Sequence, residues 1–180
     1  MSTLASELSF RLARREDLPA IVAIYNSTVA SKQVTADVSP VSVDERLTWF
    51  DAHQQAHRPL CVLCDDAGEV AAWAALSDYY PRAAYRISAE ISLYVHEAWR
   101  GRGVGRRMLS LMQQQAQQLG IRNLLALIFA HNAASIGLFS DAGFSLWGTL
   151  PQVCDLEDFE ADVVILGKRL PEASFQAALK

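Results

Sequence analysis

Residues 89–105 read AEISLYVHEAWRGRGVG, an apolar run followed by a loop in which arginine and glycine alternate. The run Ala89 to Val95 predicts a strand, and apolar residues at helical spacing from Met108 to Leu119 predict a helix. Glycines at positions 101, 103 and 105 allow the backbone to approach a ligand closely, and the N-terminal end of the helix adds positive charge. The stretch therefore predicts a strand–loop–helix unit that binds pyrophosphate.

Arginines surround the same loop. Guanidinium groups form charge-assisted hydrogen bonds with phosphate oxygens, and four of them lie close together: Arg100, Arg102, Arg106 and Arg107. A glycine-rich turn with solvated arginines is the structural alternative. Neither a dinucleotide fingerprint nor a P-loop fits, because the sequence lacks both the third glycine of Gly-x-Gly-x-x-Gly and the Gly-Lys-Ser/Thr signature.

The rest of the chain alternates predicted strands and helices. Asp17 is a candidate N-cap, Ser42 and Glu45 form a candidate capping box, and the apolar run 124–129 is typical of a strand covered on both faces. Strands are predicted at 10–12, 60–64, 69–76, 89–95, 124–129, 144–150 and 162–166, and helices at 18–29, 43–56, 105–119 and 132–142. This order predicts a mixed sheet flanked by helices.

Size and charge narrow the function classes. The 180 residues suit a single domain, residues 1–180, and 51% of them are hydrophobic. A formal net charge of −4 argues against nucleic acid as a partner, since phosphate backbones require excess basic surface. No apolar run is long enough for a membrane helix, and the start of the chain lacks a signal-peptide pattern. We therefore expect a cytoplasmic protein without membrane contact.

Cysteine and histidine give no metal-site pattern. Cys61 and Cys64 fall in a predicted buried strand, where residues three apart point to opposite faces, so core positions are favoured over a zinc or redox pair. His53 and His57 are expected to be solvated on the second helix, and His96 and His131 to be structural. No metal is expected.

Three segments closely resemble the GCN5-related N-acetyltransferases: the run 90–95, the loop 100–105 and the later HNAASIGLF at 131–139. Residues 24–28, 34–37 and 71–95 resemble the phosphinothricin acetyltransferase branch. The resemblance implies the GNAT fold, a central, mostly antiparallel mixed sheet flanked by about four helices, and acetyl-CoA as the cosubstrate. It also implies a homodimer.

The resemblance also implies roles for individual residues. Coenzyme A pyrophosphate would bind the loop Arg100, Gly101, Arg102, Gly103, Val104, Gly105 and Arg106, and its pantetheine arm would run beside Leu93, Tyr94, Val95 and Asn132. Backbone N–H groups near Leu93 would stabilise the oxyanion. Glu90 matches the base that deprotonates the amine, although an ion pair with Arg82 or Arg86 is its structural alternative. Phe139 stands where many members have a tyrosine, so no catalytic acid is assigned.

The acceptor is expected to be the primary amine of a small molecule, such as an amino acid, phosphinothricin or methionine sulfoximine. Arg82 and Tyr85 would line its pocket, with Arg82 binding a carboxylate, and Thr35 would contact the rest of the ligand. Two alternatives remain open. One is a peptide or protein N-acetyltransferase, and the other is a non-catalytic acyl-CoA sensor.

Overall fold

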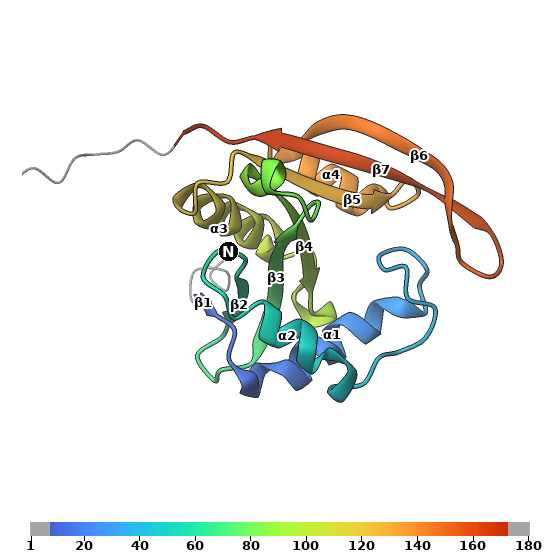
Figure 1. Cartoon of the computed structure of the whole chain (residues 1–180). Helices are drawn as coiled ribbons and strands as arrows, with labels where there is room; N and C mark the ends of the chain where they lie inside the picture. Colours follow the sequence, from blue (N-terminus) through green and yellow to red (C-terminus); the bar gives the residue numbers. More distant parts are fainter. Residues whose placement is uncertain (1–7, 173–180) are drawn as a thin grey trace, which may run out of the picture.

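One seven-stranded sheet, in the order β1-β2-β3-β4-β5-β7-β6, organises the chain (Figure 1). The computed structural model describes residues 8–172. Its strands are β1 (Ser9–Leu12), β2 (Leu60–Cys64), β3 (Val70–Asp78), β4 (Ser88–Val95), β5 (Asn123–Phe129), β6 (Ser145–Asp155) and β7 (Glu160–Arg169). Its α-helices are α1 (Leu18–Val29), α2 (Leu47–Ala52), α3 (Val104–Gln118) and α4 (Ala133–Asp141). The expected mixed, mostly antiparallel sheet with four helices is confirmed, since β4 and β5 are the one parallel pair among these strands.

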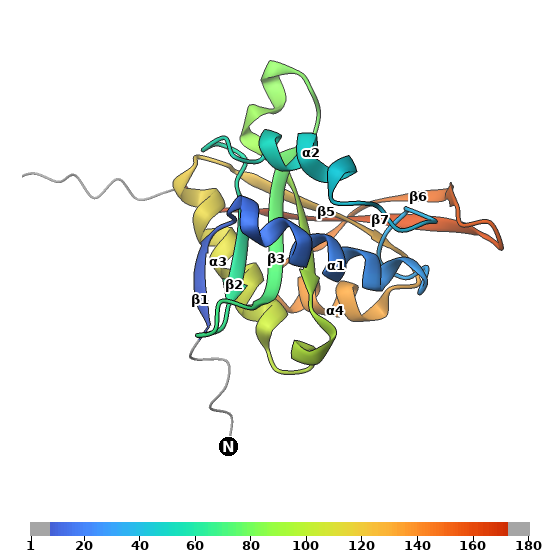
Figure 2. The ribbon, with the colours of Figure 1, turned by 90° about the horizontal axis from the view of Figure 1, so that it is seen from below.

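Both faces of the β2–β4 region are covered, which explains why residues 70–76 are all buried. Trp73 and Ala75 pack with Ile21 of α1 and Phe50 of α2. The alternate residues of β3 pack instead with Met108 and other residues of α3. Figure 2 shows α1 and α2 in front of β3 and α3 behind it. The two faces of β3 and β4 can therefore be told apart by which helix covers them.

Asp17 does not have the expected role as the side-chain cap of α1. Its carboxylate accepts hydrogen bonds from the Arg11 guanidinium at 2.6 and 2.9 Å and from the Arg14 backbone N–H at 2.6 Å. Burial opposes the ionised carboxylate, but the hydrogen bonds from Arg11 and Arg14 outweigh it and lower the pKa of Asp17. Asp17 therefore fixes the entry to α1 through an ion pair with β1 rather than through a cap.

Two element boundaries differ from the sequence prediction. The capping box is confirmed by reciprocal bonds between Ser42 and Glu45, but it opens a 3-10 turn, η2 (Asp44–Arg46), and α2 ends at Ala52 instead of continuing to residue 56. The β6–β7 hairpin is much longer than the predicted strands 144–150 and 162–166. Its register shifts at Leu146/Gly148 and at Leu150/Cys154, and these bulges interrupt the period-2 pattern by which strands are recognised.

The strands β4 and β5 separate partway along the sheet. They pair only from Ser88↔Asn123 to Glu90↔Leu125, whereas β4 stays paired with β3 as far as Val95↔Ala72. One consequence corrects the expectation that β5 is covered on both faces, because Leu127 lies beyond the paired stretch and is 41% exposed. Among the strands described here, none pairs with this edge of β4 from Ile91 onward.

Candidate active site

The open edge of β4 presents backbone N–H groups to the gap. The amide of His96 donates to the carbonyl of Ala71 on β3 at 2.9 Å, and in an antiparallel ladder such pairs recur at every second residue. The backbone N–H groups of Tyr94 and Ser92 therefore donate hydrogen bonds to β3, while the N–H groups of Leu93 and Val95 point toward the gap between β4 and β5. Donors held in this way can stabilise negative charge that develops on a carbonyl oxygen.

The Arg/Gly loop leads directly into α3, whose first residue is Val104. Gly101 has φ +71° and Gly103 has φ +79°. This is a left-handed backbone conformation that residues other than glycine adopt only at a cost in free energy. A Cβ on either residue would meet no protein atom within 4 Å, so both face open space. The N–H groups of the first turn of α3 have no acceptor within the helix, and they form an anion-binding end.

Gly105 has a different role from the other two glycines. It lies inside α3, and a Cβ there would stand 3.4 Å from Cδ2 of Leu138 and 3.5 Å from Cγ2 of Val95. Gly105 therefore packs against β4 and α4 at ordinary contact distance, whereas Gly101 and Gly103 face open space.

The arginines of the loop have distinct contacts. Arg100 donates through Nε to the Val95 carbonyl at 3.1 Å, and exposed Arg106 pairs with Asp141 at 3.4 Å. The Arg102 guanidinium lies 5.6 Å from the centre of the Trp99 ring. Arg100 and Arg106 line the groove beside the loop, and Arg102 does not.

That groove has a volume of about 860 Å³ and connects the loop with the open edge of β4. The predicted cosubstrate contacts that line it are Leu93, Tyr94, Val95, Arg100, Gly101, Gly103, Val104, Gly105, Arg106 and Asn132. Asn132 is buried and caps α4 by accepting the Ser135 N–H at 3.1 Å. An anion-binding end, cationic side chains and an unpaired strand edge in one groove suit a pyrophosphate joined to an amide-rich arm.

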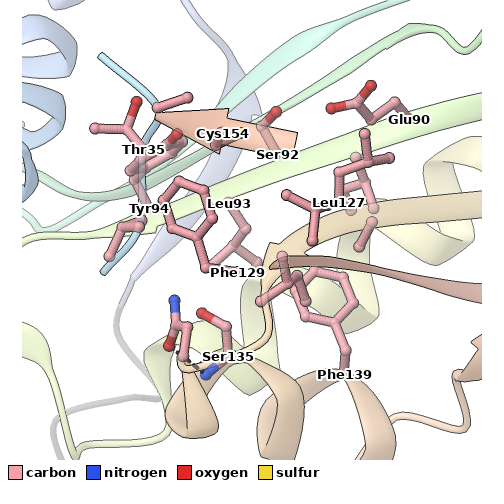
Figure 3. A pocket seen from close by; sticks show the side chains of 17 residues that line it. Thr35, Glu90, Ser92, Leu93, Tyr94, Leu127, Phe129, Ser135, Phe139 and Cys154 are labelled. Carbon is pink, nitrogen blue, oxygen red and sulfur yellow. Dashed lines mark hydrogen bonds between the residues drawn. The ribbon is translucent and has the colours of Figure 1, made fainter. Parts of the chain in front are cut away.

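A second, smaller cavity of about 260 Å³ adjoins the groove, and Leu93, Tyr94 and Asn132 line both. Figure 3 shows Glu90 and Thr35 on one side of the strand and Phe139 and Ser135 on the other. The wall is largely apolar and includes Leu93, Leu127, Phe129, Phe139 and Val163. A small acceptor could therefore meet the end of a ligand that lies in the groove.

Glu90 is the one carboxylate among the residues that line this cavity. Burial raises the pKa of Glu90 above its ordinary value. Within residues 8–172, Glu90 has no ion pair with Arg82 or Arg86: Arg82 lies over the Tyr80 ring, and Arg86 donates to the Ala83 carbonyl. A half-buried carboxylate with raised proton affinity suits proton abstraction.

Thr35 is buried in the same cavity and is held there by a polar network that the sequence did not reveal. The Tyr25 hydroxyl bonds both to Thr35 Oγ1 and to Asp37. Arg46 pairs with Asp37 at 2.9 Å and lies 4.5 Å from the centre of the Tyr25 ring. These contacts fix the segment between α1 and α2 as one wall of the cavity.

Two predicted acceptor contacts lie elsewhere within the chain. Arg82 is exposed and lines a separate cavity of about 650 Å³, and Tyr85 packs against Tyr80 and Tyr79. Neither residue lines the cavity of Glu90. The residues that line the cavity of Glu90 consequently provide a carboxylate and an apolar wall, but no cation for a substrate carboxylate.

The histidines differ from expectation at one position. His53 was expected to be solvated but is only 8% exposed, because α2 ends there and the ring turns back under the helix toward β3. His57 is exposed, and Nε2 of His131 donates a hydrogen bond to the Lys32 carbonyl at 2.8 Å. Cys61 and Cys64 are buried free cysteines, as predicted.

Residues 8–172 contain neither a metal-site cluster nor a membrane-spanning helix. No group of three or more His, Cys, Asp or Glu side chains in this range is placed to hold a metal ion. No helix in the same range has both the length and the apolarity needed to cross a membrane.

Comparison with known proteins gives consistent matches. The model of the family described as "Acetyltransferase (GNAT) family" matches residues 21–144. YwnH of Bacillus subtilis, provisionally named a phosphinothricin acetyltransferase, is 46% identical over 163 residues, 91% of this chain and 99% of its own. The L-methionine sulfoximine/L-methionine sulfone acetyltransferase of Pseudomonas aeruginosa is 38% identical over 145 residues, 81% of this chain and 84% of its own. The crystal structure of a phosphinothricin acetyltransferase (Pat) from Sinorhizobium meliloti in complex with AcCoA has a TM-score of 0.86 and 28% identity, covering 93% of this chain and 91% of its own.

Proposed function

The chain belongs to the acetyltransferase (GNAT) family, and from this premise we propose that it transfers an acetyl group from acetyl-CoA to the primary amine of an amino acid or analogue, such as methionine sulfoximine or phosphinothricin. One observation carries the proposal. The groove beside the glycine loop meets a small cavity at Leu93 and Tyr94, and that cavity contains Glu90.

Acetyl-CoA supplies the activated acetyl group when it is bound, and the chain supplies the remaining requirements. We propose that its pyrophosphate contacts the backbone of residues 101–106 and the side chains of Arg100 and Arg106. Arg102, which lies outside the groove, would attract the phosphates from a longer distance. The Leu93 and Val95 N–H groups are proposed to face the reacting carbonyl. These fixed donors and the close approach of the two substrates provide most of the expected acceleration.

Glu90 is the proposed base. An amine with a pKa of roughly 8 to 10 is mostly protonated near neutral pH and must lose a proton before it can attack. Glu90 accepts that proton directly or through water. Phe139 cannot protonate the departing thiolate, whose modest basicity, with a thiol pKa of about 8.5, allows it to leave as the anion. The proposed reaction uses no metal ion.

The small volume of the acceptor cavity favours a free amino acid over a protein substrate. Thr35 is proposed to contact this acceptor. Because no cation lines the cavity, we propose that Arg82 and Tyr85 act from a second copy of the chain, with Arg82 binding the substrate carboxylate. A cytoplasmic location, with its supply of acetyl-CoA, belongs to the same proposal.

A homodimer could use the outer strand β6. Four large apolar side chains of this strand are at least 38% exposed, namely Leu146, Trp147, Leu150 and Val153, and such exposure on an edge strand is typical of an interface. Sedimentation of the wild type and of Leu146→Lys tests this: a dimer that the lysine dissociates is expected, and a monomeric wild type would contradict it.

The decisive experiment is a panel of amines with acetyl-CoA, read by release of free thiol. Methionine sulfoximine, phosphinothricin, ordinary amino acids and a short peptide are compared, with Glu90→Gln as the control variant. Thiol release with the amino acids, lost in the variant, is expected. Release with peptides alone would favour a protein acetyltransferase, and tight acetyl-CoA binding without release would favour a sensor.

The role of Arg82 has its own test. Arg82→Lys retains the charge but loses the planar fork, so KM should rise for an acceptor that carries a carboxylate and stay constant for its amide. Equal changes with both acceptors would remove Arg82 from the site.

A further inference from the structure

His53 is a buried titratable side chain that the reaction described above does not use. Its Nδ1 lies 2.8 Å from the carbonyl oxygen of Trp49, and its Nε2 lies 3.0 Å from Oγ of Ser77 on β3. A carbonyl oxygen only accepts hydrogen bonds, so Nδ1 carries a proton in either charge state of the ring. Every change in the protonation of His53 therefore takes place at Nε2, the atom that faces Ser77.

The Ser77 hydroxyl must change from hydrogen-bond donor to hydrogen-bond acceptor toward Nε2 when His53 becomes charged. With a neutral ring, the hydroxyl donates to Nε2 and leaves its lone pairs for another donor. With a charged ring, Nε2–H donates to the hydroxyl oxygen, and the hydroxyl proton becomes available to another acceptor. Ser77 can therefore pass a proton in either direction between His53 and a group on its other side.

Glu90 is the residue paired with Ser77 on the neighbouring strand. Ser77 and Glu90 are directly opposite each other in the antiparallel pairing of β3 and β4. His96 and Ala71 form a hydrogen-bonded pair, because the His96 N–H donates to the Ala71 carbonyl. Hydrogen-bonded and non-hydrogen-bonded pairs alternate along an antiparallel ladder, so Glu90 and Ser77 are also a hydrogen-bonded pair. In such a pair the Cα atoms are about 5.5 Å apart and the two side chains lie on the same face of the sheet. This face carries Trp73 and Tyr94 and is covered by α1 and α2, so His53, Ser77 and Glu90 share it.

We propose that Ser77 and His53 are positioning residues that receive the substrate proton from Glu90, an inference that rests on the proposed function of Glu90 as the base. The amine N–H bond breaks and its proton joins the Glu90 carboxylate. That proton then passes to the Ser77 oxygen, directly or through one water, while the Ser77 hydroxyl proton moves to Nε2 of neutral His53. Glu90 is again ionised, and His53 is a cation that still donates from Nδ1 to Trp49.

The neighbouring charges leave Glu90 as the partner for a charged His53. On α2, Asp51 pairs with Arg15 at 3.3 Å, and on β3, Asp78 pairs with the buried Arg58 at 2.7 Å. Arg46, at the start of α2, pairs with Asp37 at 2.9 Å, and half-buried Tyr79 packs against Tyr85. His57, Arg82 and Arg86 are exposed. Glu90 has no ion pair among the described residues, so ionised Glu90 and charged His53 form a matched pair across Ser77.

A matched pair of variants tests the hydroxyl alone. Ser77→Thr and Ser77→Val have the same branched shape, which strands accommodate well, but only threonine retains the hydroxyl. The threonine variant should keep kcat near that of the wild type. The valine variant should lose roughly 10-fold in kcat, a fraction of what general acid–base catalysis contributes, at an unchanged KM for acetyl-CoA.

Rescue by an external base separates a proton path from a structural role. Added imidazole, at constant ionic strength, should restore kcat in Ser77→Val and in His53→Gln, and should leave the wild type and Ser77→Thr unchanged. Equal kcat in the valine and threonine variants, or a loss that imidazole does not restore, would overturn the path. If Glu90→Gln still lowers kcat in those cases, the base assignment stands; if Glu90→Gln is fully active, the base and the path both fall.

Discussion

Alanine substitution should destabilise the protein at Gly103 but not at Gly105, although the two glycines are only two residues apart. At Gly103 the backbone has φ +79°, and a Cβ would meet no atom within 4 Å. Alanine at this position would therefore lose stability through backbone strain and not through a steric clash. Holding an L-residue in the left-handed region costs about 1–2 kcal/mol. Gly103→Ala should lower the free energy of unfolding by that amount.

Gly105→Ala is the matched control. Gly105 lies in the first turn of α3, where alanine is favoured over glycine by about 0.8–1 kcal/mol. Its Cβ would stand 3.4 Å from Leu138, an ordinary contact, so little is lost to set against that gain. The free energy of unfolding of Gly105→Ala should equal or slightly exceed that of the wild type.

Urea denaturation measures both free energies, and calorimetry with coenzyme A measures binding. Gly103 lines the groove, so its new methyl group should weaken binding roughly 10-fold or more by displacing the pyrophosphate, a loss of about 1.4 kcal/mol. A folded Gly103→Ala variant with wild-type stability would refute the strain argument. Unchanged affinity in that variant would refute the placement of the pyrophosphate.

Three further changes test other parts of the structure. Burial raises the pKa of Glu90, so the ionised carboxylate opposes folding at pH values above the ordinary glutamate pKa. Glu90→Gln should therefore raise Tm at neutral pH but leave it unchanged near pH 4. The same variant should lower kcat roughly 10²- to 10⁴-fold. A Cβ on Gly167 would lie 2.0 Å from the Trp147 ring, so Gly167→Ala should destabilise the wild type but not Trp147→Ala, and equal losses in both backgrounds would contradict the contact. Asp37→Asn weakens the network that holds Thr35, so KM should rise for the amine and not for acetyl-CoA in steady-state assays, and equal rises would exclude a specific role.

The sequence predicted the parts of the fold that local patterns determine. The family, the mixed sheet and the acetyltransferase activity are confirmed, and β2 has the predicted bounds, Leu60–Cys64. A buried strand is visible because its whole run is apolar, and the glycine loop because few other structures need that spacing. Asn132 was also identified by its motif, and it lies between groove and cavity.

Features that depend on distant contacts were not predictable in the same way. His53 has a polar neighbourhood in sequence, and its burial follows from the place where α2 ends over β3. The length of β6 was not predicted, because its bulges and exposed apolar residues match neither alternating apolar and polar residues nor a continuous apolar run. Arg82 is near Glu90 in sequence, but the turn before β4 directs it to a different cavity.

The separation of β4 from β5 gives the sheet an unusual construction. Three residue pairs, from Ser88↔Asn123 to Glu90↔Leu125, join the half made of β1–β4 to the half made of β5–β7. Beyond the short seam formed by those three pairs, the backbone of β4 carries hydrogen-bonding groups that no strand within residues 8–172 satisfies. A pantetheine arm with its own amide groups would then serve as a removable eighth strand that extends the seam. On the proposed function, this piece of secondary structure would arrive with each acetyl group and depart after its transfer.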